Sequence, residues 1–219
     1  MRIIITAATE FELSLLKHKF KSTKERDVIF IATGIGMLAT SVSLMQLIYD
    51  HKPDFIIQIG IAGGFNVKEK LGKVYLVEEE FLGDVGVVEN GKWKDAFDLQ
   101  LAKANSKPFK KKGLLNSNIN KYNHLELPIV KGVTVNQIST DNNHIQQLIK
   151  KYNPIIETME GAALHYVCIL NNIPFLQIRS ISNYIGERDK TKWKIKLALN
   201  NLSKTAIAVI NHQYKLNKS

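Results

Sequence analysis

The chain has 219 residues, a formal net charge of +10 and one cysteine, Cys168, which stands in an apolar run. This length can bury a full core, so we expect a single domain over residues 1–219. A lone cysteine excludes a disulfide framework and a cysteine-built metal site, and it fits a reducing compartment.

Patterns typical of strands and of helices alternate along the chain. Runs rich in isoleucine and valine predict strands, and apolar residues three or four positions apart predict helices. Residues 90–128 are polar and rich in asparagine and lysine, and we expect loops and short elements there. In chain order, the other expected elements are strand 2–7, helix 10–20, strand 28–33, helix 37–50, strand 55–60, strand 73–83, strand 129–135, helix 141–151, a buried helix 160–171, strand 174–181 and an amphipathic helix 190–213.

This alternation predicts an α/β fold of three layers, α/β/α, around a central mixed, mostly parallel, twisted sheet. In such folds ligands bind beyond the carboxyl ends of the strands. The residues best suited to chemistry stand at those ends: Glu10, Glu12, Gly34, Gly36, Ala62, Gly63, Met159, Glu160, Ser182 and Asn183.

Composition and spacing also bear on location and partners. Glu10 and Glu12 interrupt the first apolar residues too early for a signal peptide or a membrane span, so we expect a cytoplasmic protein with no membrane partner. The lysines are spread out and no nucleic-acid motif accompanies them, so the positive charge favours a solvated basic surface over nucleic-acid binding. The histidines show no HExxH or similar spacing, and we expect neither a metal nor a cofactor.

A glycine motif, Thr33-Gly34-Ile35-Gly36, follows a strand and opens a helix. Glycines at such a turn let backbone N–H groups approach an anion or a sugar. Extended to Ala39, the motif fits the dinucleotide pattern GxGxxA. It follows the second strand, however, and the next strand ends in Ile59-Gly60 without an acid, which argues against a nicotinamide site. A purely structural tight turn remains an alternative.

Three further motifs each allow a structural and a functional interpretation. Glu160 opens an apolar helix, where an acid favours the helix dipole, but an ionised carboxylate is costly to bury unless something uses it. Glu10 and Glu12 stand in the first turn of a predicted helix. There a purely structural role, the favourable placement of an acid near the helix N-terminus, explains them as well as a functional role does. The segment Arg179-Ser180-Ile181-Ser182-Asn183 ends a buried strand, and its polar residues could mark only an emerging turn.

Taken together and in order, these pieces resemble the purine nucleoside phosphorylase and nucleosidase superfamily. They are most similar to methylthioadenosine/adenosylhomocysteine nucleosidase and its relative futalosine hydrolase. The most specific parts are Thr158-Met159-Glu160-Gly161-Ala162-Ala163 and Arg179-Ser180-Ile181-Ser182-Asn183, and the resemblance is weakest across residues 90–128. It implies a nucleoside phosphorylase-like fold and a purine nucleoside substrate.

The resemblance also implies roles for individual residues. Glu12 matches the residue that activates water, and Glu160 matches the carboxylate that binds the ribose hydroxyls, with Met159 packing against the sugar. Cleavage of an N-ribosidic bond needs such aids, because it passes through a cation-like sugar and releases a poor leaving group. The remaining candidates for substrate binding are Gly36, Ala62, Gly63, Ile138, Ser139 and Ser182.

Asn183 departs from the adenine-specific nucleosidases, which carry an aspartic acid at this position. An aspartic acid can donate to N7 of adenine and accept from the 6-amino group. An asparagine can accept from a protonated N7 and donate to a 6-oxo group, which fits hypoxanthine or guanine. The segments 182–189 and 83–87 are also more similar to futalosine hydrolase than to the adenine enzymes. Futalosine, an intermediate of an alternative menaquinone pathway, carries hypoxanthine.

The sequence favours hydrolysis over phosphorolysis. A phosphorylase binds phosphate with arginines and an N-terminal glycine-rich loop, whereas this N-terminal loop carries Glu10 and Glu12. Gln58 stands where phosphorylases place a phosphate-binding arginine. We therefore expect an N-glycosyl hydrolase that releases hypoxanthine from futalosine. An adenine nucleosidase, another purine nucleosidase or phosphorylase of this fold, and a non-catalytic nucleoside-binding protein are the alternatives.

Contacts to the 5′ substituent are less specific. Trp93 and Phe97, here or from a neighbouring subunit, are candidates, and Arg188 is a candidate partner for the benzoate of futalosine. Because the family members are commonly oligomers, we expect a homodimer or a higher homo-oligomer.

Overall fold

A computed structural model describes residues 1–21 and 26–216 of the chain. Over these ranges, eight strands form the main sheet in the order β10-β4-β8-β9-β3-β1-β2, with β7 beside β4. The strands are β1 (Arg2–Ala7), β2 (Asp27–Ala32), β3 (Phe55–Gly64), β4 (Val74–Leu82), β7 (Leu114–Leu115), β8 (Ile129–Thr134), β9 (Ile156–Thr158) and β10 (Phe175–Tyr184).

The sheet closes on itself through its longest strands. β3 pairs in parallel with β1 near its start and with β10 along most of its length, and its last residues pair with β9. β10 pairs with β4, β4 with β8 and β8 with β9, so five strands form a ring. The pairings are mixed, with β10–β4 and β3–β9 antiparallel, as the sequence predicts.

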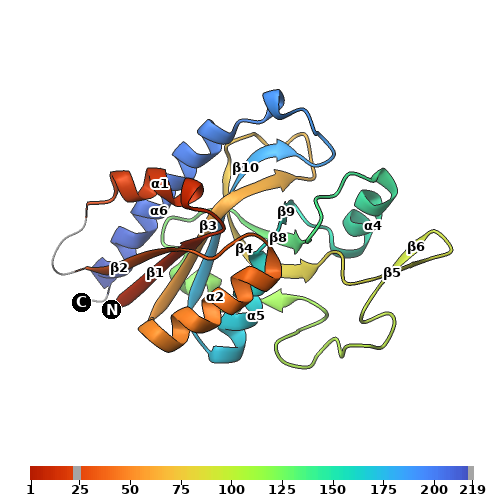
Figure 1. Ribbon diagram of the computed structural model, residues 1–219, viewed down its shortest axis with the longest axis horizontal. Helices are drawn as coiled ribbons and strands as arrows, with labels where there is room; N and C mark the ends of the chain where they lie inside the picture. Colours follow the sequence, from red (N-terminus) through yellow and green to blue (C-terminus); the bar gives the residue numbers. More distant parts are fainter. Residues whose placement is uncertain (22–25, 217–219) are drawn as a thin grey trace.

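Helices cover both faces of the sheet (Figure 1). α1 (Glu10–Lys19) and α6 (Ile195–Leu216) pack together on one face, and α2 (Gly36–His51) and α5 (Gly161–Asn171) pack together on the other. This is the expected α/β/α arrangement. α4 (Asn142–Tyr152) lies to one side, beside β8 and β6, and α3 (Ile119–Tyr122) and the short 3-10 helix η1 (Lys190–Lys192) complete the helices.

The first strand shows how the sequence builds these layers. Side chains alternate between the two faces of a strand, and a strand covered by helices on both faces needs apolar residues on both. Ile3 and Ile5 pack with Leu13 and Leu16 of α1, while Ile4 packs with Leu44 of α2. All six are fully buried. The continuous apolar run of β1 therefore places one helix pair on each side.

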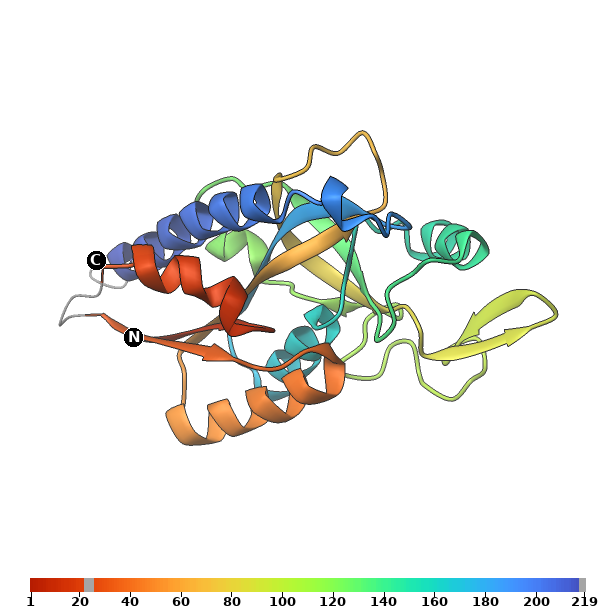
Figure 2. The ribbon, with the colours of Figure 1, turned by 45° about the horizontal axis from the view of Figure 1, so that its top comes forward.

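A small hairpin projects from the body of the molecule (Figure 2). It consists of β5 (Gly86–Glu89) and β6 (Lys92–Asp95), which the sequence analysis did not predict. Its turn is Asn90-Gly91, and both residues have positive φ angles, 50° and 71°. Asn-Gly is the preferred pair for the tight turn that joins two antiparallel strands, so the signal was present in the sequence.

The C-terminal helix begins later than predicted. The sequence pattern suggested a helix from residue 190, but η1 ends at Lys192 and α6 begins at Ile195. Trp193 between them is extended, and its indole N–H donates to the Glu187 carbonyl at 3.2 Å. The predicted helix 160–171 is confirmed as α5, but it is not buried all round, because Tyr166 is 40% exposed and Leu170 43% exposed.

A buried polar cluster lies beneath the N-terminal end of α5. Glu80 is fully buried and accepts hydrogen bonds from Gln177 Nε2 at 2.8 Å and from Thr134 Oγ1 at 2.9 Å. Gly161 leaves space for it, because a Cβ there would lie 2.1 Å from Glu80 Oε1. Burial raises the pKa of Glu80 to about 7, against the opposing effects of these hydrogen bonds and of the Arg179 charge. Thr134 also accepts from the Ala162 N–H and so joins this cluster to the start of α5.

Candidate active site

A pocket of about 350 Å³ opens at the carboxyl ends of β1, β3, β9 and β10. This is where ligands bind in open α/β sheets. Its walls are mainly apolar, and four carboxylates line it. The lining residues are Ala8, Thr9, Phe11, Glu12, Ile35, Ile61, Ala62, Gly63, Ile138, Glu157, Thr158, Met159, Glu160, Ser182, Asn183, Ile185, Gly186, Glu187, Trp193 and Ile195.

Glu12 is held rigidly in the first turn of α1. Thr9 caps this helix by accepting from the Glu12 N–H at 3.3 Å, and its hydroxyl donates back to Glu12 Oε2 at 3.1 Å. The other oxygen, Oε1, accepts from the Ile61 N–H of β3 at 3.1 Å. Its neighbour Glu10 points away, is exposed and pairs with Lys17. Of the two acids in this turn, only Glu12 reaches the pocket.

Glu160 occupies the cap position before α5. Its Oε1 accepts from the Gly36 N–H at 3.0 Å, which connects the glycine turn to the opposite wall of the pocket. Gly34 and Gly36 have φ angles of 88° and 87°, a conformation that a glycine adopts without strain. Burial raises the pKa of Glu160, the charges of Glu12 and Arg179 act in opposite directions, and the Gly36 N–H lowers it.

Arg179 supplies the positive charge between these carboxylates. Its side chain is 1% exposed, its Nη1 lies 3.7 Å from Glu160 Oε2, and its Nη2 donates to Gln58 Oε1 at 2.5 Å. Gly60 leaves room for this guanidinium, because a Cβ there would lie 2.0 Å from Nη1 and 3.2 Å from Glu12 Oε1. Arg179 and Glu12 therefore both approach Gly60, and the same Nη1 lies near Glu160.

Asn183 lies on β10 beside a bulge. The register between β10 and β3 shifts between Ile181 and Asn183, and Asn183 then pairs with Gly63. Its Oδ1 accepts from Ser182 Oγ at 2.8 Å, and its Nδ2 donates to the Tyr184 carbonyl at 3.1 Å. A carbonyl oxygen has two lone pairs and an amide nitrogen two hydrogens, so each atom retains capacity for one further bond. The segment predicted as a possible turn is thus a continuation of the strand.

The structure brings most of the predicted site residues together. Glu12, Ala62, Gly63, Ile138, Met159, Glu160, Ser182 and Asn183 all line the pocket. Two do not. Gly36 lies behind Glu160 and holds it through its N–H, and Ser139 is 4% exposed and donates its N–H to Glu157 Oε1 at 3.1 Å.

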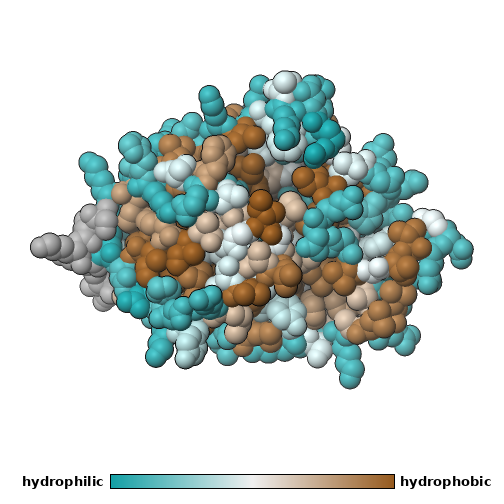
Figure 3. Space-filling view, viewed as in Figure 1, coloured by the Kyte–Doolittle hydropathy of each residue, from teal (hydrophilic) through white to brown (hydrophobic). Residues whose placement is uncertain are grey.

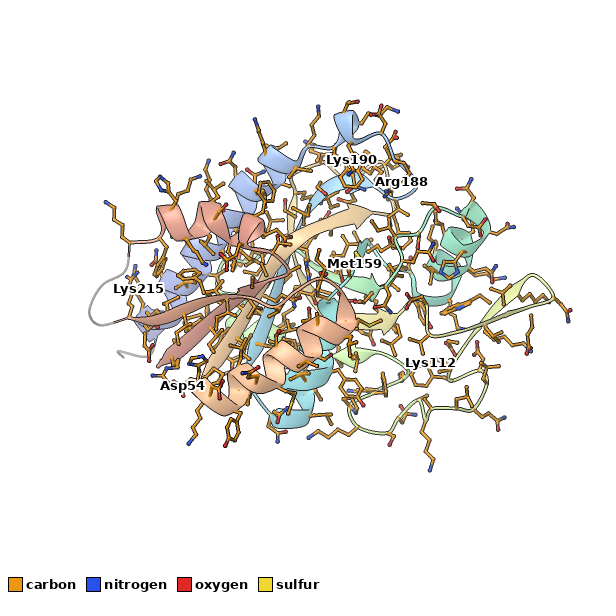
Figure 4. The ribbon with its side chains drawn as sticks, in the orientation of Figure 1. Asp54, Lys112, Met159, Arg188, Lys190 and Lys215 are labelled. Carbon is orange, nitrogen blue, oxygen red and sulfur yellow. The ribbon has the colours of Figure 1, made fainter. Side chains whose placement is uncertain are left out.

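The candidates for the 5′ substituent lie elsewhere in this chain. Trp93 is buried against Tyr152 and His144, and the ring of Phe97 packs against Phe109. Arg188 does not line the pocket, but its guanidinium lies 5.9 Å from the ring centre of Trp193, which does. In Figure 4, Arg188 lies on the loop after β10, and Met159 lies in the middle of the molecule, beside the strand ends.

Several residues in or beside the pocket were not predicted, and four of them are informative. Phe11 and Trp193 line the pocket from α1 and from the loop before α6, and no local pattern marks an aromatic residue as part of a pocket. Glu157 lies three positions before Glu160 in a strand too short to show periodicity. Arg179 stood in a recognised motif, and a charged residue in an otherwise apolar strand is itself a signal that a partner is buried with it.

Comparison with known proteins identifies the family. The sequence pattern of the phosphorylase superfamily matches residues 2–212, nearly the whole chain. The chain belongs to the phosphorylase superfamily. In the part of the chain that the structure describes, there is no group of three His, Cys, Asp or Glu side chains that could hold a metal ion. Within the same residues, no helix is long and apolar enough to cross a membrane.

Relatives within the superfamily carry two different names. The chain is 26% identical over 230 residues to a 5′-methylthioadenosine/S-adenosylhomocysteine nucleosidase of Tolumonas auensis, covering 96% of this chain and 99% of that protein. It is 27% identical over 188 residues to a futalosine hydrolase of Thermus thermophilus, covering 84% and 82%.

Solved structures confirm the fold. The native futalosine hydrolase of Helicobacter pylori aligns over 97% of this chain and 98% of its own, with a TM-score of 0.80 and 16% identity. A methylthioadenosine/adenosylhomocysteine nucleosidase of Colwellia psychrerythraea, solved with adenine, aligns over 96% and 95%, with a TM-score of 0.76 and 22% identity. At these identities the likeness is one of fold alone.

Proposed function

We propose that this chain hydrolyses the N-ribosidic bond of futalosine, giving hypoxanthine and dehypoxanthinyl futalosine in the futalosine route of menaquinone biosynthesis. The enzyme class rests on its relatives, which are N-glycosyl hydrolases by name. The choice of futalosine rests on one observation, the presence of Asn183, with its free hydrogen-bonding capacity, in the wall of the pocket.

In this proposal Glu160 acts on the sugar. Its carboxylate accepts hydrogen bonds from the ribose hydroxyls, and its charge stabilises the positive charge that develops on the sugar as the bond to the base breaks. The Gly36 N–H and the Arg179 guanidinium fix the carboxylate and favour its ionised form, against the effect of burial. Met159, in the pocket wall beside Glu160, packs against the sugar.

Glu12 orients and deprotonates the attacking water. Its carboxylate is anchored by the Ile61 N–H and the Thr9 hydroxyl, so it can accept the proton without moving. Among the described lining residues there are four glutamates, Glu12, Glu157, Glu160 and Glu187, and no lysine or arginine. The nearby Arg179 is already engaged by Glu160 and Gln58. A phosphate dianion would meet net repulsion there, and a neutral water would not.

Asn183 holds the base. Its carbonyl can accept from the N7–H that forms as hypoxanthine departs, and its amide can donate to O6.

For the benzoate of the 5′ arm we place Arg188 as the cation, because it stacks over the pocket residue Trp193. A methylthioadenosine or adenosylhomocysteine nucleosidase is the second candidate, favoured by the apolar wall of Phe11, Ile35 and Ile138, which suits a thioether arm.

The role of Glu12 can be tested with Glu12→Gln, which keeps the shape of the side chain and removes the base. We expect kcat to fall about a thousandfold while substrate still binds, because general-base catalysis typically contributes a factor of this order. Glu10→Gln is the matched control, since Glu10 lies in the same turn but outside the pocket. Full activity of Glu12→Gln in a steady-state assay would contradict the assignment.

The role of Asn183 can be tested with Asn183→Asp and the pair futalosine and 6-amino-6-deoxyfutalosine. We expect the ratio of kcat/KM for the 6-oxo over the 6-amino substrate to fall by about tenfold or more, because a buried unpaired hydrogen-bonding group is costly. The two substrates share one sugar and one 5′ arm, so changes in folding cancel in the ratio. An unchanged ratio would remove Asn183 from base recognition.

We further propose that the enzyme is a homodimer joined through α2. Its outer face carries an apolar stripe at helical spacing, from Ile35 at 62% exposure through Leu38 at 81% and Val42 at 60% to Met45 and Tyr49. Figure 3 shows apolar surface gathered on the face of the molecule where α2 lies. Because Ile35 also lines the pocket, a second copy on this stripe would cover the pocket mouth, and we favour it over an unrelated partner.

The double variant Leu38→Glu/Val42→Glu tests this interface. We expect light scattering after gel filtration to give the dimer mass for the wild type and the monomer mass for the variant. The two paired stripes of the variant would bury negative charges against one another. Lys204→Glu, on the exposed side of α6, is the control and should remain dimeric. A wild-type protein that stays monomeric at micromolar concentration would contradict the proposal.

A further inference from the structure

The first turn of α5 is capped by side chains from two neighbouring strands. The residue before a helix normally accepts one of the unpaired N–H groups of that turn with its own side chain. Glu160 holds this position, but within the described structure its carboxylate makes no capping hydrogen bond and lines the pocket instead. Thr158 of β9 accepts the first N–H of the helix at 3.2 Å, and Thr134 of β8 accepts the second at 2.8 Å. These two hydroxyls therefore leave the Glu160 carboxylate free for the site.

Glu80 orients the two hydroxyls. A hydroxyl has one hydrogen, which must point away from the N–H group that its oxygen accepts. Thr134 Oγ1 donates to Glu80 Oε2 at 2.9 Å. Thr158 Oγ1 lies 3.4 Å from Glu80 Oε1 and 3.1 Å from Thr134 Oγ1, so its hydrogen stays within the same cluster. Glu80 therefore acts on the start of α5 through the threonines, although it does not line the pocket.

On its other side, Glu80 adjoins two further buried side chains, Gln177 and His165. His165 Nδ1 lies 2.7 Å from the Leu114 carbonyl, and because a carbonyl only accepts, Nδ1 carries the hydrogen. Burial lowers the pKa of His165 to about 4, so the ring is neutral and its Nε2 is an acceptor. The Gln177 side chain is close enough to act on this ring. Even so, among the described residues Gln177 Oε1 and His165 Nε2 are both buried without a hydrogen-bond partner.

One proton on Glu80 would give each of these atoms a partner. While Gln177 Nε2 donates to Glu80 Oε1 at 2.8 Å, the two acceptors Gln177 Oε1 and His165 Nε2 are left unpaired, which is destabilising. The two ends of an amide have nearly the same shape, so the hydrogen-bond network decides its orientation. With the amide turned end for end, its Nε2 donates to His165, and its Oε1 accepts from a protonated Glu80.

We propose that Glu80 is a positioning residue that works as a neutral carboxylic acid, within a hydrogen-bonded chain that runs from His165 to Thr134 at the start of α5. By capping α5, this chain holds the Glu160 backbone in place and leaves its carboxylate to the pocket. The inference rests on the proposed function for its activity assay only, because the protonation of Glu80 can also be measured through folding.

Ionisation of Glu80 then limits activity at alkaline pH. Burial raises its pKa to about 7, against its hydrogen bonds and the charge of Arg179 on β10. On the other elements around β4, His165 of α5 acts through Gln177, Lys131 of β8 pairs with Glu79, and α6 covers the opposite face. An ionised Glu80 can no longer donate to Gln177, and it competes with Glu160 for the charge of Arg179. We therefore expect kcat/KM of the wild type to fall as the pH rises through this range.

The first test is Glu80→Gln, which reproduces the shape and the donor of the acid but not the charge of the carboxylate. Its amide nitrogen can donate to Gln177 Oε1, and its oxygen can accept from Thr134. We expect the fall in kcat/KM for futalosine between about pH 7 and pH 9 to be absent from this variant. Glu79→Gln, which removes the neighbouring charge on β4, is the control and should keep the wild-type fall.

His165→Phe is a second variant, which keeps an aromatic ring and removes the acceptor for the Gln177 amide. The amide then donates to Glu80 and favours its ionised form, so we expect the fall in kcat/KM to move to lower pH by about one unit. A role of His165 in packing alone would lower stability without moving this fall.

Urea unfolding measures the proton on Glu80 without an assay of activity. A carboxyl group whose pKa is higher in the folded than in the unfolded chain binds its proton more tightly when folded, so the unfolding free energy falls as the pH rises between the two pKa values. Glu80→Gln lacks this proton. Relative to the wild type, its folding equilibrium constant should therefore rise by about tenfold or more between about pH 5 and pH 8.

Three outcomes would overturn the inference. They are a Glu80→Gln variant that does not fold, which would mean that a carboxylate is required, a variant with the wild-type pH profile, and a stability difference that does not change with pH. If futalosine is not cleaved by the wild type, the proposed function fails, and the urea series alone decides the inference.

Discussion

One buried guanidinium organises the acidic site. Arg179 contacts Glu160 and Gln58 and approaches Gly60, as Glu12 does, and its charge also opposes the raised pKa of Glu80. Without a cation at this point, ionising the surrounding carboxylates would be prohibitive in so buried a setting. With it, the site keeps a surplus of negative charge. Such a site favours a cation-like sugar and a neutral nucleophile. Arg179 therefore influences both the stability of the buried site and the choice of reaction.

The geometry around this arginine depends on the closure of the sheet. β3 is long enough to pair with β1 at its start and to reach β9 and β10 at its end. The bulge in β10 adjusts the register so that Asn183 is level with Gly63, and β9 brings Glu157 to the other edge of the same glycine. These two pocket residues thus lie on strands rather than on loops, which holds them at a fixed separation.

Much of the fold follows from local sequence patterns. The long elements show strong periodicity, and their predicted bounds agree with the structure to within a few residues. β9 has only three residues and is too short for periodicity to reveal. Its place is set by pairing with β3 and β8, which are distant in the chain. The late start of α6 likewise reflects a tertiary contact, the indole of Trp193 on the Glu187 carbonyl, which a helical pattern does not encode.

Site residues that belong to a recognisable sequence motif could be predicted. Site residues that are brought to the pocket only by the fold could not. Glu12, Glu160 and Asn183 stood in motifs at strand ends, and the structure gathers them in one pocket. Gly36 and Ser139 were predicted to bind substrate from their positions in the sequence. In the structure each donates its backbone N–H to a carboxylate of the site, a contact that sequence spacing does not reveal. Glu157 gave no local signal, since its place in the pocket wall follows from the pairing of β9 with β3.

The most direct test of the account is the release of free base by the wild-type enzyme, followed with and without inorganic phosphate. The substrates are futalosine, 6-amino-6-deoxyfutalosine, inosine and methylthioadenosine. The account predicts that hypoxanthine is released from futalosine at a rate that phosphate does not change, with much slower release from the 6-amino substrates. Release that requires phosphate would contradict hydrolysis. Faster release of adenine from methylthioadenosine would contradict the choice of base that rests on Asn183.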